Sequence, residues 1–348
     1  MRVLDSLGLR EALEAVSVRP EAIHFRLFES GEILHEVPQG KVYQERYGVP
    51  YFHVHRADLH GILASAVEAA SPECVHLGAH AKAFAETAEG VTLQLADGRC
   101  FEGDVLVGAD GIKSAIRAGI LGSTEANWTG NAAWRATVET KRLPDDFMET
   151  VVSNFVGPRK HMVVYYLRRG ELVNMVGVVE NDAWREEAWN VKAPWEELKA
   201  DFAGWCDTVQ TLIDVVPKDA CYRWALFDRV PVDDWSTDRA TLLGDSAHAT
   251  LPFMASGAAM AIEDARVLQR ALDQESSVAA GLQCYQRNRF ERTARVVNGS
   301  TAMQAAYHQP DAEAFRQQFA AVRSAESKGD TPPDQWLGEY DANSVELV

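Results

Sequence analysis

The stretch Ala240–Asp264, with the sequence ATLLGDSAHATLPFMASGAAMAIED, decides the fold. It begins with the short apolar run Ala240–Leu243, which Gly244 closes, so we read the run as a buried strand. Asp245 then stands at the carboxyl end of that strand, where ligands bind in open α/β sheets and a carboxylate can accept hydrogen bonds from ribose hydroxyls. The alternative is an ordinary strand, loop and helix with Asp245 as a helix cap.

The second half of this stretch predicts a helix that begins at Gly257. Apolar residues recur there at spacings of three and four, which indicates one buried face: Met260, Ala261, Ala265, Leu268 and Leu272. Pro252 precedes the helix, and small residues including Ala258 surround its start. A flat ligand or a phosphate could therefore approach the backbone N–H groups of the first turn.

A second aspartate next to a glycine follows another predicted strand. The apolar run Val105–Val107 is typical of a fully buried strand, and it leads into Gly108, Asp110 and Gly111. Because the same arrangement of glycine and aspartate occurs at two strand ends, a ligand site is a better explanation than a coincidence of sequence.

Arg56 is a third candidate, at a strand-to-helix junction in the stretch Val54–Leu63. It is either a phosphate or ribose contact or a solvated charge. Asp58 is expected to cap the helix that follows. Upstream, the region 23–36 alternates around a Ser30-Gly31 turn and predicts two short paired strands.

From Trp128 the sequence becomes rich in predicted strands, at 151–156, 161–167 and 172–179, with a hairpin turn at 168–170. His161 and Tyr165 are four residues apart and share one face of a strand, where they could line a pocket for an aromatic substrate. Alternatively, both are ordinary half-buried strand residues. Helices are expected at 195–215 and 282–306, the latter with arginines that we assign to a solvated face with acidic partners. The acidic tail after Pro332-Pro333 is expected to be loosely ordered.

Composition excludes several classes of function. The 348 residues carry a net charge of −17, which argues against nucleic acid or an anionic membrane as a partner. No apolar run is long enough to span a bilayer, and no signal segment is evident. The five cysteines are scattered, so we expect reduced thiols in the cytoplasm and no metal site.

Taken together, five stretches resemble the flavin-dependent aromatic monooxygenases of the p-hydroxybenzoate hydroxylase class, particularly the salicylate and 6-hydroxynicotinate hydroxylase branch. They are VHRADLHGIL from Val54, DVLVGADGIKSAIR from Asp104, AAWRA from Ala132, HMVVYYLRRGELVNMV from His161, and LLGDSAHATLPFMASGAAMAIEDA from Leu242. Their order and spacing carry the resemblance, which extends to about Ala306.

The resemblance implies a mixed α/β fold: a Rossmann-like FAD-binding domain that is incomplete at its N-terminus, with an inserted, mostly antiparallel substrate sheet. It divides the chain into an FAD-binding domain at 1–127 with a short β insertion near 23–55, a substrate-binding sheet at 128–230, a return to the FAD-binding domain at 231–306, and a partly flexible segment at 307–348.

The resemblance also implies roles for the candidate residues. Asp110 and Gly111 match a motif for FAD and the reduced nicotinamide cofactor, Asp245 the aspartate on the flavin-side ribose, and Arg56 an arginine that contacts the flavin cofactor. The residues that match the loop and helix start against the flavin ring are Pro252, Gly257 and Ala258. His161 and Tyr165 match the substrate pocket, with His161 as the candidate base.

The implied reaction is hydroxylation of a small hydroxylated aromatic or pyridine carboxylate. NAD(P)H reduces FAD, O2 forms a flavin hydroperoxide, and one oxygen passes to the activated ring. A homodimer is compatible with the resemblance.

One departure leaves alternatives open. The family begins with a strand, a G-x-G-x-x-G turn and a helix that binds the diphosphate, and this sequence contains no such fingerprint. The sequence is then either a fragment of a longer protein or a shortened, flavin-poor homologue that acts as a binding or interaction protein. A weaker third option is a flavin oxidoreductase of the same fold with a non-aromatic substrate.

Overall fold

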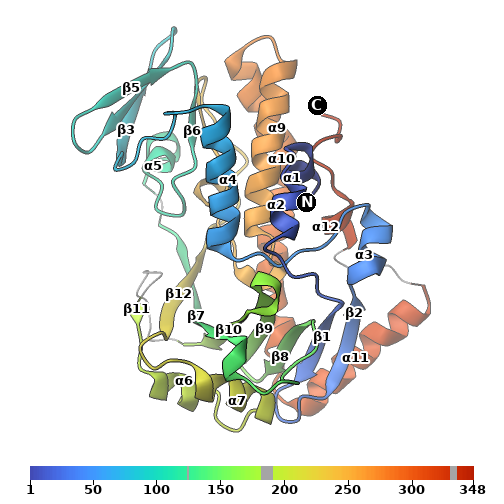
Figure 1. The fold of residues 1–348 in the computed structure, drawn as a ribbon. Helices are drawn as coiled ribbons and strands as arrows, with labels where there is room; N and C mark the ends of the chain where they lie inside the picture. Colours follow the sequence, from blue (N-terminus) through green and yellow to red (C-terminus); the bar gives the residue numbers. More distant parts are fainter. Residues whose placement is uncertain (124, 182–190, 330–334) are drawn as a thin grey trace.

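The computed structural model describes residues 1–123, 125–181, 191–329 and 335–348. A large sheet lies below a group of helices, and a small sheet projects at the upper left (Figure 1). The helices are α1 (Arg2–Ser6), α2 (Arg10–Glu14), α3 (Gly40–Tyr47), α4 (Arg56–Ala70), α5 (Ala115–Leu121), α6 (Trp195–Asp201), α7 (Asp207–Val215), α8 (Asp245–His248), α9 (Gly257–Gln274), α10 (Val278–Tyr307), α11 (Ala312–Ser327) and α12 (Gln335–Glu339). Short 3₁₀ turns are η1 (Thr140–Arg142), η2 (Arg168–Gly170) and η3 (Pro252–Met254). The strands are β1 (Ala22–Leu27), β2 (Ile33–Pro38), β3 (Ala81–Glu86), β4 (Val91–Leu95), β5 (Cys100–Gly103), β6 (Leu106–Gly108), β7 (Asn127–Glu139), β8 (Val152–Gly157), β9 (Lys160–Leu167), β10 (Leu172–Glu180), β11 (Val191–Lys192), β12 (Tyr222–Asp228) and β13 (Ala240–Leu242).

The large sheet has eight strands in the order β11-β12-β7-β10-β9-β8-β1-β2. All neighbours are antiparallel except β1 and β8. Successive side chains alternate between two faces. The outer face, with Trp134 and Met162, packs on α6 and α7, which lie beneath the sheet (Figure 1). The inner face, with Ala133 and Val178, packs against η3, α11 and the end of α10. The mixed α/β fold with a mostly antiparallel sheet is as expected.

The N-terminal hairpin belongs to this same sheet. β1 and β2 pair with each other, as the alternation at 23–36 predicts, but β1 also runs parallel to β8. Residues 22–38 therefore extend the sheet that the sequence assigns to 128–230. This pairing joins segments far apart in the chain, so local alternation could not predict it.

A second, parallel pair is formed by β6 and β13, the two strands that carry the aspartates. Gly108 is needed where β6 meets α5, because an added Cβ would lie 2.7 Å from Cβ of Ile116 and 2.9 Å from Cδ2 of Leu242. The prediction that Val105–Val107 is fully buried is wrong. Val107 is 36% exposed. In the described part of the chain β6 has β13 as its one ladder neighbour, so its other edge is unpaired.

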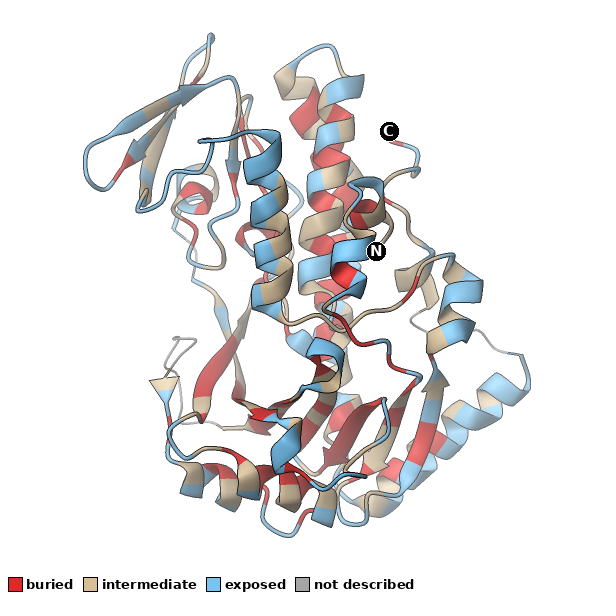
Figure 2. Cartoon of the chain, viewed as in Figure 1, coloured by how far each residue is buried: buried red, intermediate tan, exposed pale blue. Residues whose placement is uncertain are grey.

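Helices α9 and α10 form the spine of the upper part, with buried residues along their contact (Figure 2). The arginines of α10 were predicted to form a solvated face, and this prediction is wrong for one of them. Arg289 is fully buried and its Nε donates to Asp264 of α9 at 2.7 Å, while Arg292 pairs with Glu263. The prediction of acidic partners is confirmed for Arg289 and Arg292. Periodicity alone does not say which helical face another helix covers.

The C-terminal residues pack onto the spine and are not loose, which corrects the prediction for the tail. Pro332 and Pro333 lie outside the described residues, but Ala342 and Leu347 are buried in the same core as α9 and α10. Arg270 donates to the carbonyl oxygens of Ala342 and Val345 at 2.9 and 2.8 Å. These polar contacts and the two apolar anchors hold an otherwise acidic segment in place.

All five cysteines are free thiols. No helix in the described part of the chain is both long and apolar enough to cross a membrane. Among the described residues, no group of three or more His, Cys, Asp or Glu side chains is arranged to hold a metal ion.

Candidate functional site

The loop after β13 presents Asp245 to solvent. Gly244 has φ of 63° and ψ of −139°, a conformation that favours glycine, and an added Cβ would lie 3.1 Å from Cβ of Ala261. Asp245 is exposed although Gly244 and Ser246 on either side are buried. The alternative reading of Asp245 as a helix cap is wrong, because Asp245 is the first residue of α8 and the N-cap is Gly244. Its exposed carboxylate can accept hydrogen bonds from a ligand.

A buried carboxylate holds this loop from below. Asp264 of α9 accepts hydrogen bonds from Gly244 N at 3.0 Å, His248 Nε2 at 2.7 Å and Arg289 Nε at 2.7 Å. Burial alone would raise the pKa of Asp264, but His248 and Arg289 lower it to about 2. The loop is therefore anchored by an ionised carboxylate in the core.

Asp110 ties the two predicted loops together rather than facing solvent alone. Its carboxylate accepts from Ala115 N at 2.7 Å and from the hydroxyl of Ser114, the N-cap of α5, so it binds the start of that helix. The Ser246 hydroxyl donates to the same carboxylate at 3.3 Å and accepts from Gly111 N at 2.9 Å. Gly111 has φ of 79°, with open space where a side chain would be. The structure thus brings both glycine-aspartate loops to one place.

The segment that opens α9 offers free backbone donors. Ser256 is the N-cap of α9, but its side chain makes no capping hydrogen bond and donates instead to Met254 O at 2.8 Å. Pro252 and Ala258 are exposed, and Gly257 begins the helix. The N–H groups of this first turn and the positive end of an 18-residue helix can therefore meet an electron-rich group.

Arg56 is the first residue of α4 and is exposed. The predicted cap Asp58 is wrong: the N-cap is His55, whose Nδ1 accepts from Ala57 N at 3.3 Å. Asp58 lies in the first turn and accepts two hydrogen bonds of 2.8 Å from Arg168. The ion pair joins α4 to the turn after β9.

His161 and Tyr165 share the inner face of β9, as predicted, but they have different neighbours. The ring of His161 lies 5.0 Å from Phe253 of η3 and 4.8 Å from Tyr307. The ring of Tyr165 lies 4.6 Å from His53. The two Cα atoms are roughly 13 Å apart along the strand. The pair therefore marks two ends of one patch on the sheet, not a contact.

Burial sets the protonation of both residues. It lowers the pKa of His161 well below its usual value, with His308 adding to the effect, so the imidazole is neutral at neutral pH. Burial raises the pKa of Tyr165, although Arg135 opposes this shift, so the phenol keeps its proton. His161 can accept a proton and Tyr165 can donate a hydrogen bond.

Three neighbours of these residues were not predicted: His308, Glu180 and Arg135. His161 Nδ1 lies 2.9 Å from His308 Nε2, and His308 Nδ1 lies 2.8 Å from Glu180 Oε1. Arg135 lies on the inner face in register with Val176 of β10. A signal for Arg135 existed, since it falls in the stretch AAWRA that carries the resemblance. His308 lies beyond that stretch, so its approach to His161 gave no signal.

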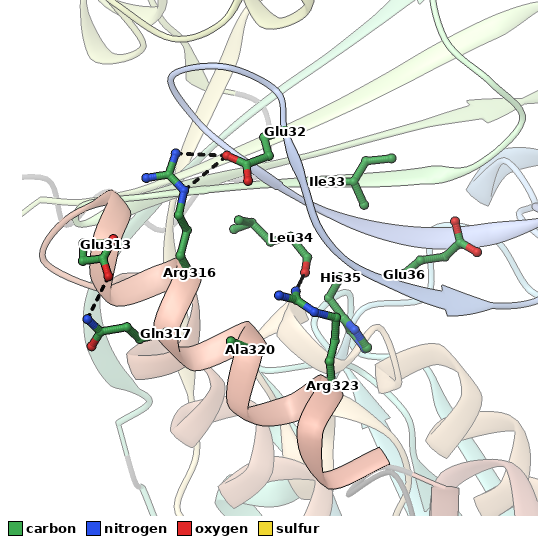
Figure 3. Close-up of a pocket in the computed structure, with 10 residues that line it drawn as sticks. All are labelled: Glu32, Ile33, Leu34, His35, Glu36, Glu313, Arg316, Gln317, Ala320 and Arg323. Carbon is green, nitrogen blue, oxygen red and sulfur yellow. Dashed lines mark hydrogen bonds and ion pairs between the residues drawn. The ribbon is translucent and has the colours of Figure 1, made fainter. Parts of the chain in front are cut away.

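Two cavities lie away from these residues. One of about 550 Å³ runs between β2 and α11. Two polar side chains that line it bind neighbouring carboxylates: Arg316 binds Glu32, and Gln317 donates to Glu313 (Figure 3). The other, of about 650 Å³, lies beside Arg19 and Tyr166. Neither is lined by a predicted site residue, so volume alone does not locate the site.

The donor set fits part of FAD. The exposed Asp245 suits a ribose, and the small, uncapped start of α9 suits a flat ring that gains negative charge. The sequence has no glycine-rich turn for the diphosphate. The fit therefore extends to the ring and ribose portions.

Known proteins share this chain's sequence and fold. A family described as an FAD binding domain matches residues 1–300. The chain is 36% identical over 345 residues to 3-amino-4-hydroxybenzoate 2-monooxygenase PtnB3 of Streptomyces platensis. The aligned residues cover 99% of this chain and 85% of the relative. It is 35% identical to 3-hydroxybenzoate 6-hydroxylase of Polaromonas naphthalenivorans, over 94% of this chain and 80% of the relative.

Further relatives agree. The chain is 33% identical to 6-hydroxynicotinate 3-monooxygenase of Bordetella bronchiseptica, over 85% of this chain and 77% of the relative. A solved salicylate hydroxylase substrate complex superimposes with a TM-score of 0.81 and 25% identity, over 98% of this chain and 85% of that one. The chain therefore belongs to the FAD-dependent aromatic monooxygenases.

Proposed function

We propose that this protein hydroxylates a small aromatic or pyridine ring that carries both a hydroxyl and a carboxylate, with NAD(P)H as reductant and O2 as oxygen donor. The observation that carries the proposal is His161, a buried neutral imidazole on the inner face that contacts the loop opening α9. Relatives named for hydroxybenzoates and hydroxynicotinate support the substrate class.

His161 is the base in this proposal. Removing the proton from a ring hydroxyl makes the ring electron-rich, and a neutral imidazole accepts that proton. Tyr165, protonated and on the same face, would orient the ring by a hydrogen bond. Phe253, whose ring meets His161 edge-on, would help exclude water.

Arg135 would bind the carboxylate. It is half-buried on the inner face, and no carboxylate among the described residues pairs with it. In the sheet register, Arg135 is opposite Val176, which is opposite Val163 on β9, between His161 and Tyr165. A ring lying over these valines would place a carboxylate toward Arg135 and a hydroxyl toward His161. A guanidinium is suited to bidentate binding of a carboxylate.

FAD would supply the oxygen-transfer chemistry once reduced. The residues that would hold it are Asp245 and Arg56, with Pro252, Gly257 and Ala258 against the ring and Asp110 and Gly111 linking the loops. The start of α9 would stabilise negative charge on the reduced ring.

The first test is the absorbance spectrum of the purified protein with added FAD, followed by NAD(P)H consumption and product analysis with hydroxybenzoates and hydroxypyridines. Flavin binding and a hydroxylated product are expected. A protein that stays colourless with added FAD would instead support the flavin-poor binding homologue.

Replacing His161 tests its role. His161→Ala should slow hydroxylation by about 10² or more, because general base catalysis contributes about 10²–10⁴. Flavin reduction without substrate should change little. An equal loss in both reactions would remove His161 from the substrate site.

Arg135→Gln should weaken binding of 3-hydroxybenzoate by about tenfold or more, because a charge-assisted hydrogen bond of about 1.5–3 kcal/mol is lost. Binding of phenol, which lacks the carboxylate, should stay within a factor of about two. Titration calorimetry of both ligands with both proteins measures this, and equal weakening for phenol would contradict the assignment.

A further inference from the structure

His161, His308 and Glu180 form a continuous line of side chains from three elements. His161 lies on β9, His308 follows the last turn of α10, and Glu180 ends β10. The His161 Nδ1 to His308 Nε2 distance is 2.9 Å, and His308 Nδ1 lies 2.8 Å from Glu180 Oε1. His161 is 2% exposed, whereas the Glu180 side chain is 23% exposed. The line therefore leads from a buried imidazole to solvent.

Glu180 is an acceptor at neutral pH. Burial would raise the pKa of its carboxyl, but hydrogen bonds from Arg159 and His308 lower it overall. Arg159 Nε donates to Oε2 at 2.9 Å, and Gln304 also hydrogen-bonds the carboxyl. Oε1 is thus available to accept from His308.

The carboxylate of Glu180 determines which nitrogen carries the proton in each of the two histidines. A carboxylate can only accept, so His308 must carry its proton on Nδ1. Burial lowers the pKa of His308, although Glu180 opposes this shift, so the ring is neutral. Its Nε2 is then unprotonated and accepts hydrogen bonds through its lone pair. His161 must then donate from Nδ1, which leaves its own Nε2 without a proton. An unprotonated Nε2 is what a base needs.

We propose that His308 and Glu180 are positioning residues that hold His161 in the Nδ1-protonated tautomer and conduct its proton to the surface. The inference rests on the proposed function, in which His161 takes the proton of a ring hydroxyl.

The proton transfer balances without another reactant. The substrate O–H bond breaks and its proton binds Nε2 of His161. The proton on His161 Nδ1 passes to His308 Nε2, and that on His308 Nδ1 passes to Glu180, which releases it to solvent. Both imidazoles are neutral before and after, and one negative charge remains on the substrate oxygen. Among the described residues, the Tyr307 and Phe253 rings, Arg159 and Gln304 also lie against the line.

The first test needs no ligand. Long-range ¹H–¹⁵N spectra of the ¹⁵N-labelled protein report the tautomer of each histidine, with His161→Gln and His308→Gln providing assignments. At pH 7 both rings should be protonated on Nδ1. In Glu180→Gln the amide can donate as well as accept, so a mixture of tautomers is expected. A proton on Nε2 of His161 in the wild type would overturn the proposal.

The second test uses 4-hydroxy-3-nitrobenzoate, whose phenolate absorbs visible light. The pKa of the bound probe should rise by about one unit in His308→Gln and Glu180→Gln. Each substitution breaks the hydrogen-bonded line that holds His161 ready to accept the proton of the probe's hydroxyl. Glu36→Gln is the matched control, because Glu36 lies 2.9 Å from His24 in the same sheet but outside this line. The control should match the wild type.

Unchanged probe ionisation in both line variants would overturn the proposal. Should His308→Gln fail to fold, Glu180→Gln changes a partly exposed side chain and carries the test alone. Failure of the wild type to bind or ionise any hydroxybenzoate would count against the proposed function, and the tautomer spectra would still decide the positioning role.

Discussion

Burial of His53 makes the stability of the folded protein depend on pH. Its ring packs between Tyr51 and Tyr165, and burial lowers its pKa from 6.5 to about 4. Because the unfolded chain binds this proton at higher pH than the folded chain, stability is lost as pH falls from 6.5 toward 4.

His53→Phe keeps an aromatic ring at this position and removes the titrating group. Between pH 7 and 4.5 the variant should lose about 2–3 kcal/mol less unfolding free energy than the wild type, measured by urea denaturation. A wild-type pH dependence in His53→Phe would contradict the assignment.

At this scale the sequence predicted candidates whose chemistry is visible locally. Asp110 and Asp245 were found because each follows an apolar run and lies beside a glycine. Arg135 and Glu180 could not be found in the same way. Their relation to His161 depends on which strands neighbour which, and cross-strand register is not written in a single strand.

The contact of α9 with α10 depends on a buried ion pair. Asp264→Asn would leave Arg289, which is fully buried, without its full counter-charge and weaken the bond to Gly244 N. Breaking a buried pair from one side costs about 3–5 kcal/mol. Urea denaturation at pH 7 should show a loss of this size. Asp273→Asn, on an exposed part of α9, should change stability by less than about 0.5 kcal/mol. A similar small change in Asp264→Asn would mean that the pair does not hold the two helices.

Elements with regular periodicity were predicted well, and their surroundings less so. The strands predicted at 161–167 and 172–179 lie within β9 and β10, and the one at 151–156 is one residue out of step with β8 (Val152–Gly157). Alternation and a tight turn are local properties, which is why these strands could be predicted. The arginines of α10 were assigned to solvent because a helix carries charge on its surface by default. Only the position of α9 reveals that one of them is enclosed.

For the whole molecule, the C-terminal residues connect parts that are distant in sequence. Arg2 donates to the carbonyl oxygens of Gly338 and Tyr340, both at 2.9 Å, and Leu347 is buried beside α9 and α10. Deleting residues 340–348 should lower the melting temperature by about 5 °C or more. Val348→Ala, at a side chain that is 75% exposed, should melt like the wild type. Calorimetric scans of the three proteins provide the test, and an unchanged melting temperature in the deletion would show that the tail contributes no stability.

The parallel pairing of β1 with β8 has a consequence for biosynthesis. Ile23 pairs with Val152, so the hairpin leaves the ribosome long before its neighbour strand, and residues 39–151 are made in between. Such non-local contacts raise contact order and slow folding. Until β8 arrives, the free edge of β1 can recruit other nascent chains. Chaperone demand during expression should therefore centre on this hairpin, and residues 128–230 produced alone would expose the complementary edge of β8.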